Sequence, residues 1–231
     1  MRSRETSTGR RASFATLLAC LLALAPPASA FDDTDAGSQV PLSDLLEIIV
    51  LPRTLLAIDA TSGGETEQPL EIGESVRWYA TRGRVGAVIT DRRMLFVATS
   101  SAAWQQARLR RGEEPPASVL LGDRVALVTT PKRAFGFDGG SGNLVESSLG
   151  PREVVIDAVV GENVGVVLTD RRALGVSPYA GGFFTARMNL GERTESMVAK
   201  ANLVTLTTPR RILVFRGPTG GWEERDRSLH D

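Results

Sequence analysis

The sequence predicts an all-β protein built from five copies of one unit. A short basic turn recurs at an almost constant spacing, and runs rich in valine, isoleucine, leucine and threonine stand on both sides of each copy. Glycine, serine and proline separate these runs, as expected for short strands joined by tight turns. Together these observations predict units of about 39 residues with four strands each.

The basic turn sets the period of the repeat. It reads LPRT, TDRR, TPKR, TDRR and TPRR, and the copies begin at residues 51, 90, 130, 169 and 208, with steps of 39, 40, 39 and 39 residues. Proline, the second residue in three copies, fixes φ, and we expect the aspartate of the other two to cap backbone N–H groups of the turn. Each copy is therefore predicted to be a hairpin turn in the middle of its unit.

Two further runs complete each unit. The third run begins fourteen residues after the start of the turn, at Glu65, Trp104, Leu144, Phe183 and Trp222. Because four of these five residues are large and apolar, we expect this position to pack between neighbouring units. A glutamate-containing junction, with Glu74, Glu113, Glu153 or Glu192, then leads to the fourth run, the inner strand of the next unit. The first unit has only QVPLSD, residues 39–44, as a candidate inner strand.

The strand order and the junctions IGE, RGE, LGPRE and LGE resemble β-propeller repeats of the WD-repeat and PQQ-type superfamilies. The resemblance is one of pattern, since no Trp-Asp dipeptide or kelch double glycine recurs in each unit, and it implies no site residues. It covers residues 39–227 and implies a single five-bladed β-propeller with four-stranded blades of about 39 residues. The alternatives are a first blade completed by strand exchange from the C-terminal end and an open arc that closes only on dimerisation.

The N-terminus has the pattern of a secretory signal peptide over residues 1–30. Four arginines precede the apolar run FATLLACLLALA, and PPASA ends it. The run is too short to span a bilayer, so we expect no transmembrane segment in the mature chain. Residues 31–38 are predicted to be a flexible leader and residues 228–231 a polar tail. We expect an exported bacterial protein, periplasmic or extracellular; the alternative is a lipoprotein attached through Cys20, because LLAC resembles a lipobox.

Composition excludes several function classes. Cys20 is the only cysteine, so cleavage would leave a mature chain without a disulfide or a cysteine nucleophile. Removal of residues 1–30 changes the net charge from 0 to −3, which does not favour nucleic-acid binding. The only histidine, His230, lies in the polar terminus, so neither a catalytic triad nor a histidine metal site is expected. Phosphate-binding and calcium-loop motifs are missing, and we expect no cofactor or metal.

Glycoside hydrolysis is a reaction that needs only carboxylates as catalytic groups. The inner strands offer Asp157 and Glu195, with Asp44 as a doubtful third, but these acids do not occupy matching positions in their units. We therefore expect a non-enzyme. A carbohydrate-active propeller, either a lectin or a glycoside hydrolase, and a purely structural propeller are the alternatives.

The recurring cations form the candidate binding site. In a propeller the basic turns and the glutamate junctions emerge on one face, where the cations would gather: Arg53, Arg92, Arg93, Lys132, Arg133, Arg171, Arg172, Arg210 and Arg211. One interpretation is salt bridging to the junction glutamates. The other is that cations left unpaired bind an acidic partner. The sequence thus predicts an exported binding or assembly module for a protein or an acidic glycan.

Overall fold

The computed structural model describes residues 45–101 and 103–227. The chain divides into two compact units, residues 1–39 and 40–231, and all described residues belong to the second unit. The predicted signal peptide, the leader, the candidate strand at 39–44 and the polar tail, with Cys20, Asp44 and His230, lie outside the described residues.

The described residues form 19 β-strands in five antiparallel sheets, and each sheet follows the chain without a crossover. The first sheet has three strands: β1 (Leu46–Val50), β2 (Thr54–Asp59) and β3 (Glu65–Pro69). The second contains β4 (Val76–Arg82), β5 (Val85–Thr90), β6 (Arg93–Ala98) and β7 (Gln105–Arg108). The third contains β8 (Ser118–Leu121), β9 (Val125–Thr129), β10 (Arg133–Asp138) and β11 (Asn143–Ser148).

The last two sheets repeat the four-stranded pattern. The fourth contains β12 (Val155–Val160), β13 (Gly165–Thr169), β14 (Arg172–Ser177) and β15 (Ala180–Arg187). The fifth contains β16 (Ser196–Ala199), β17 (Leu203–Thr207), β18 (Arg211–Arg216) and β19 (Gly221–Asp226). The five predicted units, and four strands in four of them, are therefore confirmed.

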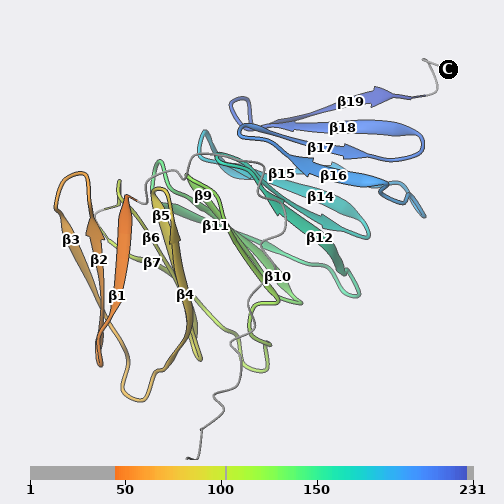
Figure 1. The fold of residues 1–231 in the computed structure, drawn as a ribbon. Helices are drawn as coiled ribbons and strands as arrows, with labels where there is room; N and C mark the ends of the chain where they lie inside the picture. The colour runs from red at the N-terminus through yellow and green to blue at the C-terminus, as the bar shows by residue number, and fades with distance from the viewer. Residues whose placement is uncertain (1–44, 102, 228–231) are drawn as a thin grey trace, which may run out of the picture. The chain divides into compact units, whose positions relative to one another are not determined.

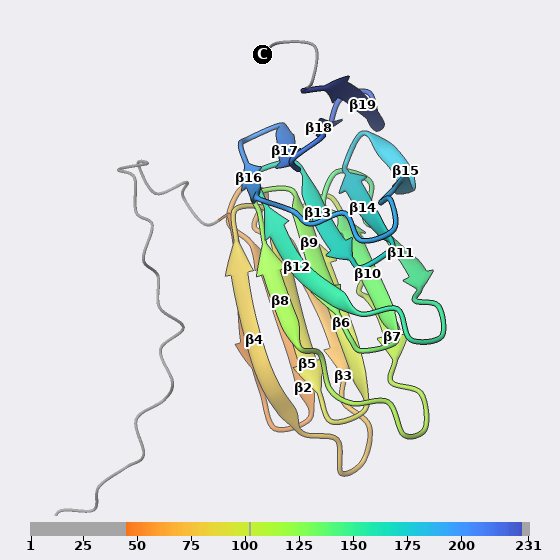
Figure 2. The same cartoon turned by 90° about the vertical axis from the view of Figure 1, so that its right-hand side faces the viewer.

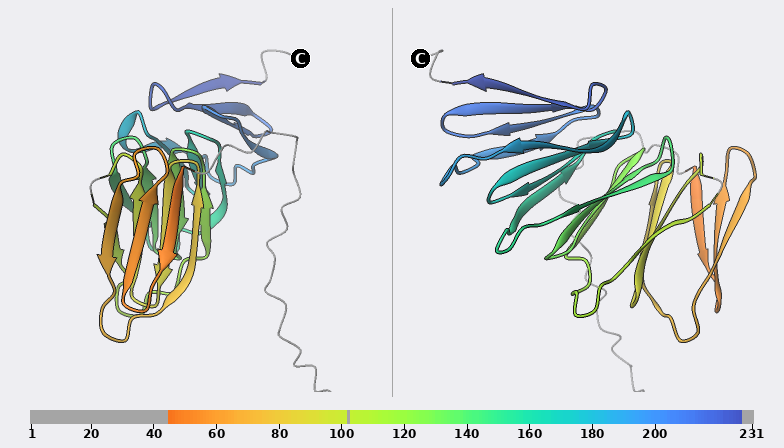
Figure 3. Two further views of the ribbon diagram at one scale, coloured as in Figure 1. Left: turned by 60° about the vertical axis from the view of Figure 1, so that its left-hand side comes forward. Right: turned by 180° about the vertical axis from the view of Figure 1, so that it is seen from behind.

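The sheets of this unit stack face to face in chain order (Figure 1). The inner strands β4, β8, β12 and β16 follow one another on one side of the stack, and the outer strands β7, β11 and β15 follow one another on the other (Figure 2). The first and fifth sheets lie at opposite ends of the row in the right-hand view of Figure 3. The described sheets thus form an open row, and the closed ring that the sequence suggested is not formed.

Burial on both faces explains the composition of the central strands. Every residue of β5, β6, β9, β10 and β13 is buried, because a sheet in the middle of the row packs on both neighbours. In β5, Val85, Ala87 and Ile89 face the third sheet, whereas Val88 faces the first. Apolar residues on both faces of a strand produce the continuous valine- and leucine-rich runs of the sequence.

The sheets are joined by four apolar clusters and by backbone hydrogen bonds. Residues of complementary size meet at each joint: a Cβ on Gly136 would lie 3.2 Å from the Phe183 ring, and one on Gly175 would lie 2.6 Å from Phe215. Trp104 packs against the first sheet and donates its indole N–H to the Thr66 carbonyl at 3.1 Å. Trp222 donates to Phe184 in the same way at 2.8 Å. The predicted packing of the third run between units is confirmed at these tryptophans.

One backbone hydrogen bond joins each pair of consecutive sheets at the turns between inner and second strands. The amides of Leu45, Arg84, Arg124 and Asn163 each donate to a carbonyl of the next sheet at 2.8 Å. Backbones approach closely at this corner, and a Cβ on Gly122 would collide with the Gly161 carbonyl. Glycine is required there because only hydrogen leaves room for the next sheet.

Candidate binding edge and its arginine–glutamate clusters

One edge of the row contains the basic turns and the junctions that link consecutive sheets. In the second sheet, Thr90 starts the turn, and its Oγ1 accepts hydrogen bonds from the amides of Arg92 at 3.1 Å and Arg93 at 2.9 Å. Thr130, Thr169 and Thr208 make the same pair of bonds in their own sheets. A threonine cap therefore holds the turn and orients the two cations that follow it.

The aspartate of the turn has a different role from the one we expected. Asp91 Oδ1 accepts a hydrogen bond from the amide of Ser75 at 2.9 Å, and Asp170 Oδ1 accepts one from Val154 at 3.0 Å. Both amides precede an inner strand. The prediction that aspartate caps the turn is wrong: the threonine before it occupies that position, and aspartate fixes the start of the inner strand.

The second cation of four turns enters a buried cluster with the junction glutamate. Arg93 donates from Nε to Glu74 Oε1 and from Nη2 to Glu74 Oε2, both at 2.8 Å. Thr90 Oγ1 donates to Glu74 Oε1 at 2.8 Å, and the Glu71 amide donates to Oε2 at 2.7 Å. The Arg93 side chain is 4% exposed and that of Glu74 is 0% exposed. The carboxylate accepts four hydrogen bonds, which offset the cost of burying its charge.

The same cluster recurs with Arg133 and Glu113, Arg172 and Glu153, and Arg211 and Glu192. Each arginine also donates to a backbone carbonyl at the end of the preceding sheet: Pro69, Arg108, Ser148 or Arg187, at 2.8 to 2.9 Å. One guanidinium thus ties its own turn, the junction loop and the preceding sheet together. The predicted salt bridges are confirmed for the second cation of these turns.

These contacts determine the pKa of the glutamates. Burial alone would raise the pKa of Glu113, but hydrogen bonds from Arg133, the Arg110 amide and Thr130 lower it to about 2. The hydrogen bond from Arg211 is the main cause that lowers the pKa of Glu192 to about 2. The pKa of Glu74 is lowered to about 2 and that of Glu153 is also lowered, in each case against the effect of burial. The carboxylates remain ionised at neutral pH.

The first turn keeps a cation but has no such cluster. Leu51 occupies the position of the capping threonine and Thr54 that of the buried arginine, so neither group that binds the glutamate is present. Arg53, the remaining cation, is exposed. The cluster therefore belongs to the joints between sheets, where an arginine reaches a carbonyl of the sheet before it.

The junction loops each contain one residue with positive φ directly before the glutamate. It is Gly73, Gly112 or Gly191 in three loops, with φ of 75°, 70° and 72°. In the loop between the third and fourth sheets it is Arg152, with φ of 61°. A side chain at such a φ costs free energy, so this loop holds an exposed cation in a strained backbone.

The first cation of every turn is exposed at the edge: Arg53, Arg92, Lys132, Arg171 and Arg210. Arg92 lies 3.3 Å from Glu71, and Arg171 lies 4.0 Å from Asp170, with side chains 40% and 51% exposed. Lys132 donates to the Gly112 carbonyl at 3.4 Å. Such exposed contacts contribute little to stability, and the charges remain available to a partner.

A pocket of about 200 Å³ lies beside the fifth turn. Arg193 and Arg210 line it, together with Pro209 and the junction residues Asn189–Glu192. Glu192 is held by Arg211, so it does not neutralise the two exposed arginines. Arg193 was not predicted as a site residue, because it lies outside the recurring turn; its signal was the charge next to the junction glutamate.

The acids that could have supported glycoside hydrolysis do not form a pair in a pocket. Asp157 lines a second pocket, of about 470 Å³, between β8 and β12, where the other acid is Glu153. Glu153 is held by Arg172 and Thr169. Glu195 forms an ion pair with Arg227 at 2.6 Å. Within the described part of the chain, no group of three or more acid, histidine or cysteine side chains is placed to hold a metal, and no helix meets the length and hydropathy of a membrane span.

Consecutive antiparallel sheets of four up-and-down strands, repeated in chain order, define a β-propeller-type repeat protein. No protein-family model and no curated protein matches the sequence. Solved structures of β-propeller type are similar to it at low identity. Kluyveromyces lactis Hsv2 is 10% identical over 82% of this chain and 84% of that chain, with a TM-score of 0.33.

Two further solved structures are similar to this chain. Prp20p from Saccharomyces cerevisiae is 11% identical over 73% of this chain and 56% of that chain, with a TM-score of 0.37. HIRA(644–1017) is 7% identical over 84% of this chain and 59% of that chain, with a TM-score of 0.38. The propeller-type class assigned to this chain rests on its own sheet topology.

Proposed function

We propose that the protein is an exported, non-catalytic binding module whose basic edge holds an acidic partner, either a protein or an acidic glycan. The observation that carries this proposal is the different environment of the two cations in each turn. In four of them the second cation is neutralised by a glutamate in a cluster that is buried or, at Arg172, partly buried, while the first cation remains at the surface. Since the clusters already join the sheets, the exposed cations are free for binding.

The pocket beside the fifth turn supports a specific contact point on this edge. Arg193 and Arg210 place two positive charges at one depression, and an anionic group between them would satisfy both guanidinium groups. Along the rest of the edge the cations recur once per sheet, so an elongated acidic chain would meet several of them in succession.

The proposal of export rests on the N-terminal pattern of residues 1–30. A chain with its only cysteine in that segment would be free of thiols after cleavage, which suits an oxidising compartment. Mass spectrometry of the protein secreted by its natural host tests this part: a mature chain that begins near residue 31 supports it, and a chain that retains Met1 contradicts it.

Binding at the edge is tested with two probes, heparin as an acidic glycan and poly-glutamate as an acidic polypeptide. The double variant Arg193→Glu, Arg210→Glu is expected to bind at least tenfold more weakly to whichever of the two probes the wild-type protein binds. The measurement is made at about 0.1 M salt, where exposed charges still interact. A matched control, Arg82→Glu with Arg84→Glu, changes two exposed cations at the opposite edge. Equal loss in both variants, or failure of the wild-type protein to bind either probe, would contradict the proposal.

A further inference from the structure

The sheets at the two ends of the row each present one face that no other described sheet covers. At the first sheet this face contains an aliphatic strip of Ile49, Leu56 and Ile58, in register across β1 and β2. At the fifth sheet it contains Val198, Leu203, Ile212 and Val214, in register across β16, β17 and β18. Val198 is 47% exposed and Leu203 is 37% exposed.

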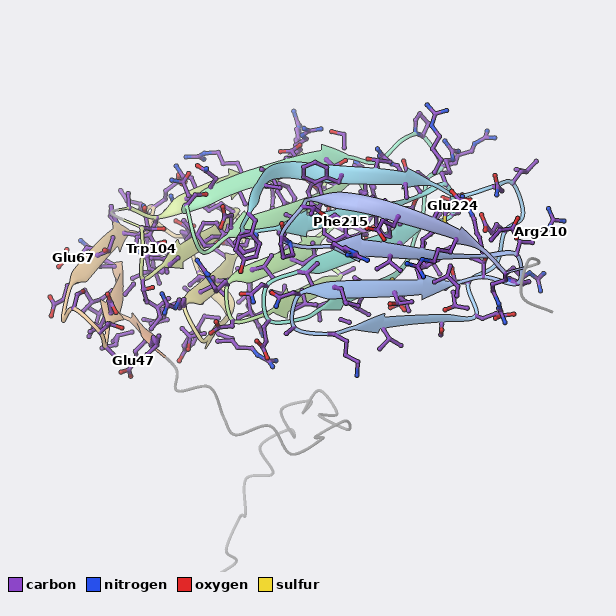
Figure 4. All side chains as sticks on the ribbon, turned by 90° about the horizontal axis from the view of Figure 1, so that it is seen from above. Glu47, Glu67, Trp104, Arg210, Phe215 and Glu224 are labelled. Carbon is purple, nitrogen blue, oxygen red and sulfur yellow. The ribbon has the colours of Figure 1, made fainter. Side chains whose placement is uncertain are left out.

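The uncovered faces carry opposite charges. Glu47, Glu65 and Glu67 lie on the face of the first sheet, next to Ile58 and Leu56 in the strand register. All three are exposed, and none forms an ion pair with another described residue. Figure 4 shows Glu47 and Glu67 at the end of the molecule that the first sheet forms.

The face of the fifth sheet has an excess of one positive charge, since it carries two arginines and one acid, Glu223, which pairs with Val214 in the strand register. Arg216 pairs with Leu203 and Arg225 pairs with Ile212 in the strand register, so both side chains lie on the same face as the aliphatic strip. Arg216 forms an exposed contact with Glu223 at 3.0 Å, whereas Arg225 has no ion pair among the described residues. The two ends therefore differ in charge but share an apolar centre.

We propose that these two faces bind each other between copies of the chain, so that the acidic face of one copy stacks on the basic face of a second. Every joint within the row is made by the same two faces of consecutive sheets, and each of the four is apolar at its centre. A second copy would continue that stacking. Joints of this head-to-tail type produce closed rings when the rotation per copy allows closure, and chains otherwise.

The repeat indicates which residues would meet at the new joint. Glu47 corresponds to Gly86, and a Cβ on Gly86 would lie 2.6 Å from Ile48 Cδ1 and 3.0 Å from Leu46 Cδ2. The counterparts of Ile48 and Leu46 in the fifth sheet are Thr205 and Leu203. Glu47 of one copy would thus lie over Thr205 and Leu203 of the other.

That position brings opposite charges together. Arg216 is the cross-strand neighbour of Leu203, so it would lie beside Glu47 of the second copy. The residue sizes also match. Glu65 stands where Phe183 packs against Gly136 in the internal joint, and Val214 replaces that glycine in the fifth sheet. A shorter, charged side chain on one side is matched by a larger aliphatic side chain on the other.

Lys200 distinguishes the new joint from the internal joints that the third and fourth sheets make with the sheets after them. It occupies the position of Gly122 and Gly161, whose missing side chains let the next sheet approach. The backbone that those glycines meet belongs to the turn after an inner strand. The corresponding residues of the first sheet, 43 and 44, precede the described strands, and the described part of that sheet has no inner strand. We therefore expect the ionic pairs to contribute more to this joint than to the internal ones.

Sedimentation velocity of the mature chain over a range of concentrations tests the proposal. The wild-type protein is expected to form species of two or more copies, with association weakened at least tenfold between about 0.05 and 0.5 M salt, because the contact includes exposed charges. Glu47→Arg and Arg216→Glu are each expected to weaken association by at least tenfold. The exposed Glu114, at the junction edge, provides the matched control Glu114→Arg, which should associate as the wild type does.

Charge exchange separates this contact from a general loss of folding. An equimolar mixture of the Glu47→Arg and Arg216→Glu proteins should associate as strongly as the wild type, although each alone associates at least tenfold more weakly, and the double variant should also recover association. Circular dichroism confirms that each single variant keeps the wild-type fold. A wild-type protein that remains a monomer at all concentrations, or single variants that the exchange does not rescue, would overturn the proposal. Because this contact does not use the basic edge, its failure leaves the binding of heparin or poly-glutamate unaffected.

Discussion

The first sheet and the third sheet each contain a copy of the basic turn, but only the copy in the third sheet joins it to a neighbour. In the third sheet, Arg133 is buried with Glu113 and reaches the Arg108 carbonyl of the sheet before it. In the first sheet, Thr54 replaces this arginine, no described sheet precedes it, and the hairpin between β1 and β2 still forms. The difference shows that the cluster is not needed to make the hairpin; its role is to join one sheet to the next.

The largest expected effect comes from removing the arginine of the third sheet. Arg133→Met would leave the Glu113 carboxylate buried without its main partner, and breaking a buried pair in this way costs about 3 to 5 kcal/mol. Urea unfolding measured by circular dichroism should show a correspondingly lower midpoint. The matched change in the first sheet, Arg53→Met, removes an exposed cation and should change stability by less than about 0.5 kcal/mol. Equal effects of the two changes would contradict the comparison.

Acid should also lower the stability of the protein by disrupting the arginine–glutamate clusters. The glutamates of the clusters have a folded-state pKa lowered to about 2 in three cases, below the value of about 4.3 for an unfolded glutamate. Their contribution to stability is therefore complete above the unfolded pKa and is lost as pH falls from about 5 towards 2. Urea midpoints at pH 7, 4 and 2.5 should fall steeply for the wild type. Arg133→Met should show a weaker dependence, and an unchanged dependence would argue against the cluster as its source.

The smallest expected effect concerns the junction between the third and fourth sheets. Arg152 has φ of 61°, where the other three junctions have glycine. Arg152→Gly should relieve the backbone strain and raise stability by about 1 kcal/mol. Gly112→Arg, the reverse change at the preceding junction, should lower it by a similar amount, as measured by thermal unfolding. A loss of stability in Arg152→Gly would show that the Arg152 side chain makes a stabilising contact that outweighs the strain.

The repeat could be predicted from the sequence because the basic turn has one sequence at one spacing. The turn and junction positions also predicted, as one of two interpretations, salt bridges between the turn cations and the junction glutamates, but not that the second cation of each turn forms them. The role of the threonine was not predicted, although threonine occurs in four of the five turns, because proline or aspartate after it offered a sufficient explanation of the turn. Hydrogen bonds to Thr90 and Asp91 depend on which amides face each side chain, and spacing alone does not define that.

The open row could not be predicted from the period, because consecutive sheets pack in the same way whether or not a ring closes. The relevant signals are substitutions at the ends. Glu47 stands where the other sheets have glycine, alanine or valine, and Glu65 stands where they have tryptophan, leucine or phenylalanine. Lys200 likewise replaces a glycine at the opposite end. These charges become meaningful only when the register shows that they lie on the two uncovered faces.

Neighbouring cations of one turn have separate roles, and the fifth turn offers a direct comparison of the two. Urea unfolding of Arg210→Met and Arg211→Met compares an exposed cation with one that binds Glu192 at the next position. We expect a midpoint close to that of the wild type for Arg210→Met and a loss of about 3 kcal/mol in the free energy of unfolding for Arg211→Met. Equal midpoints for the two variants, or a larger loss in Arg210→Met, would contradict this expectation.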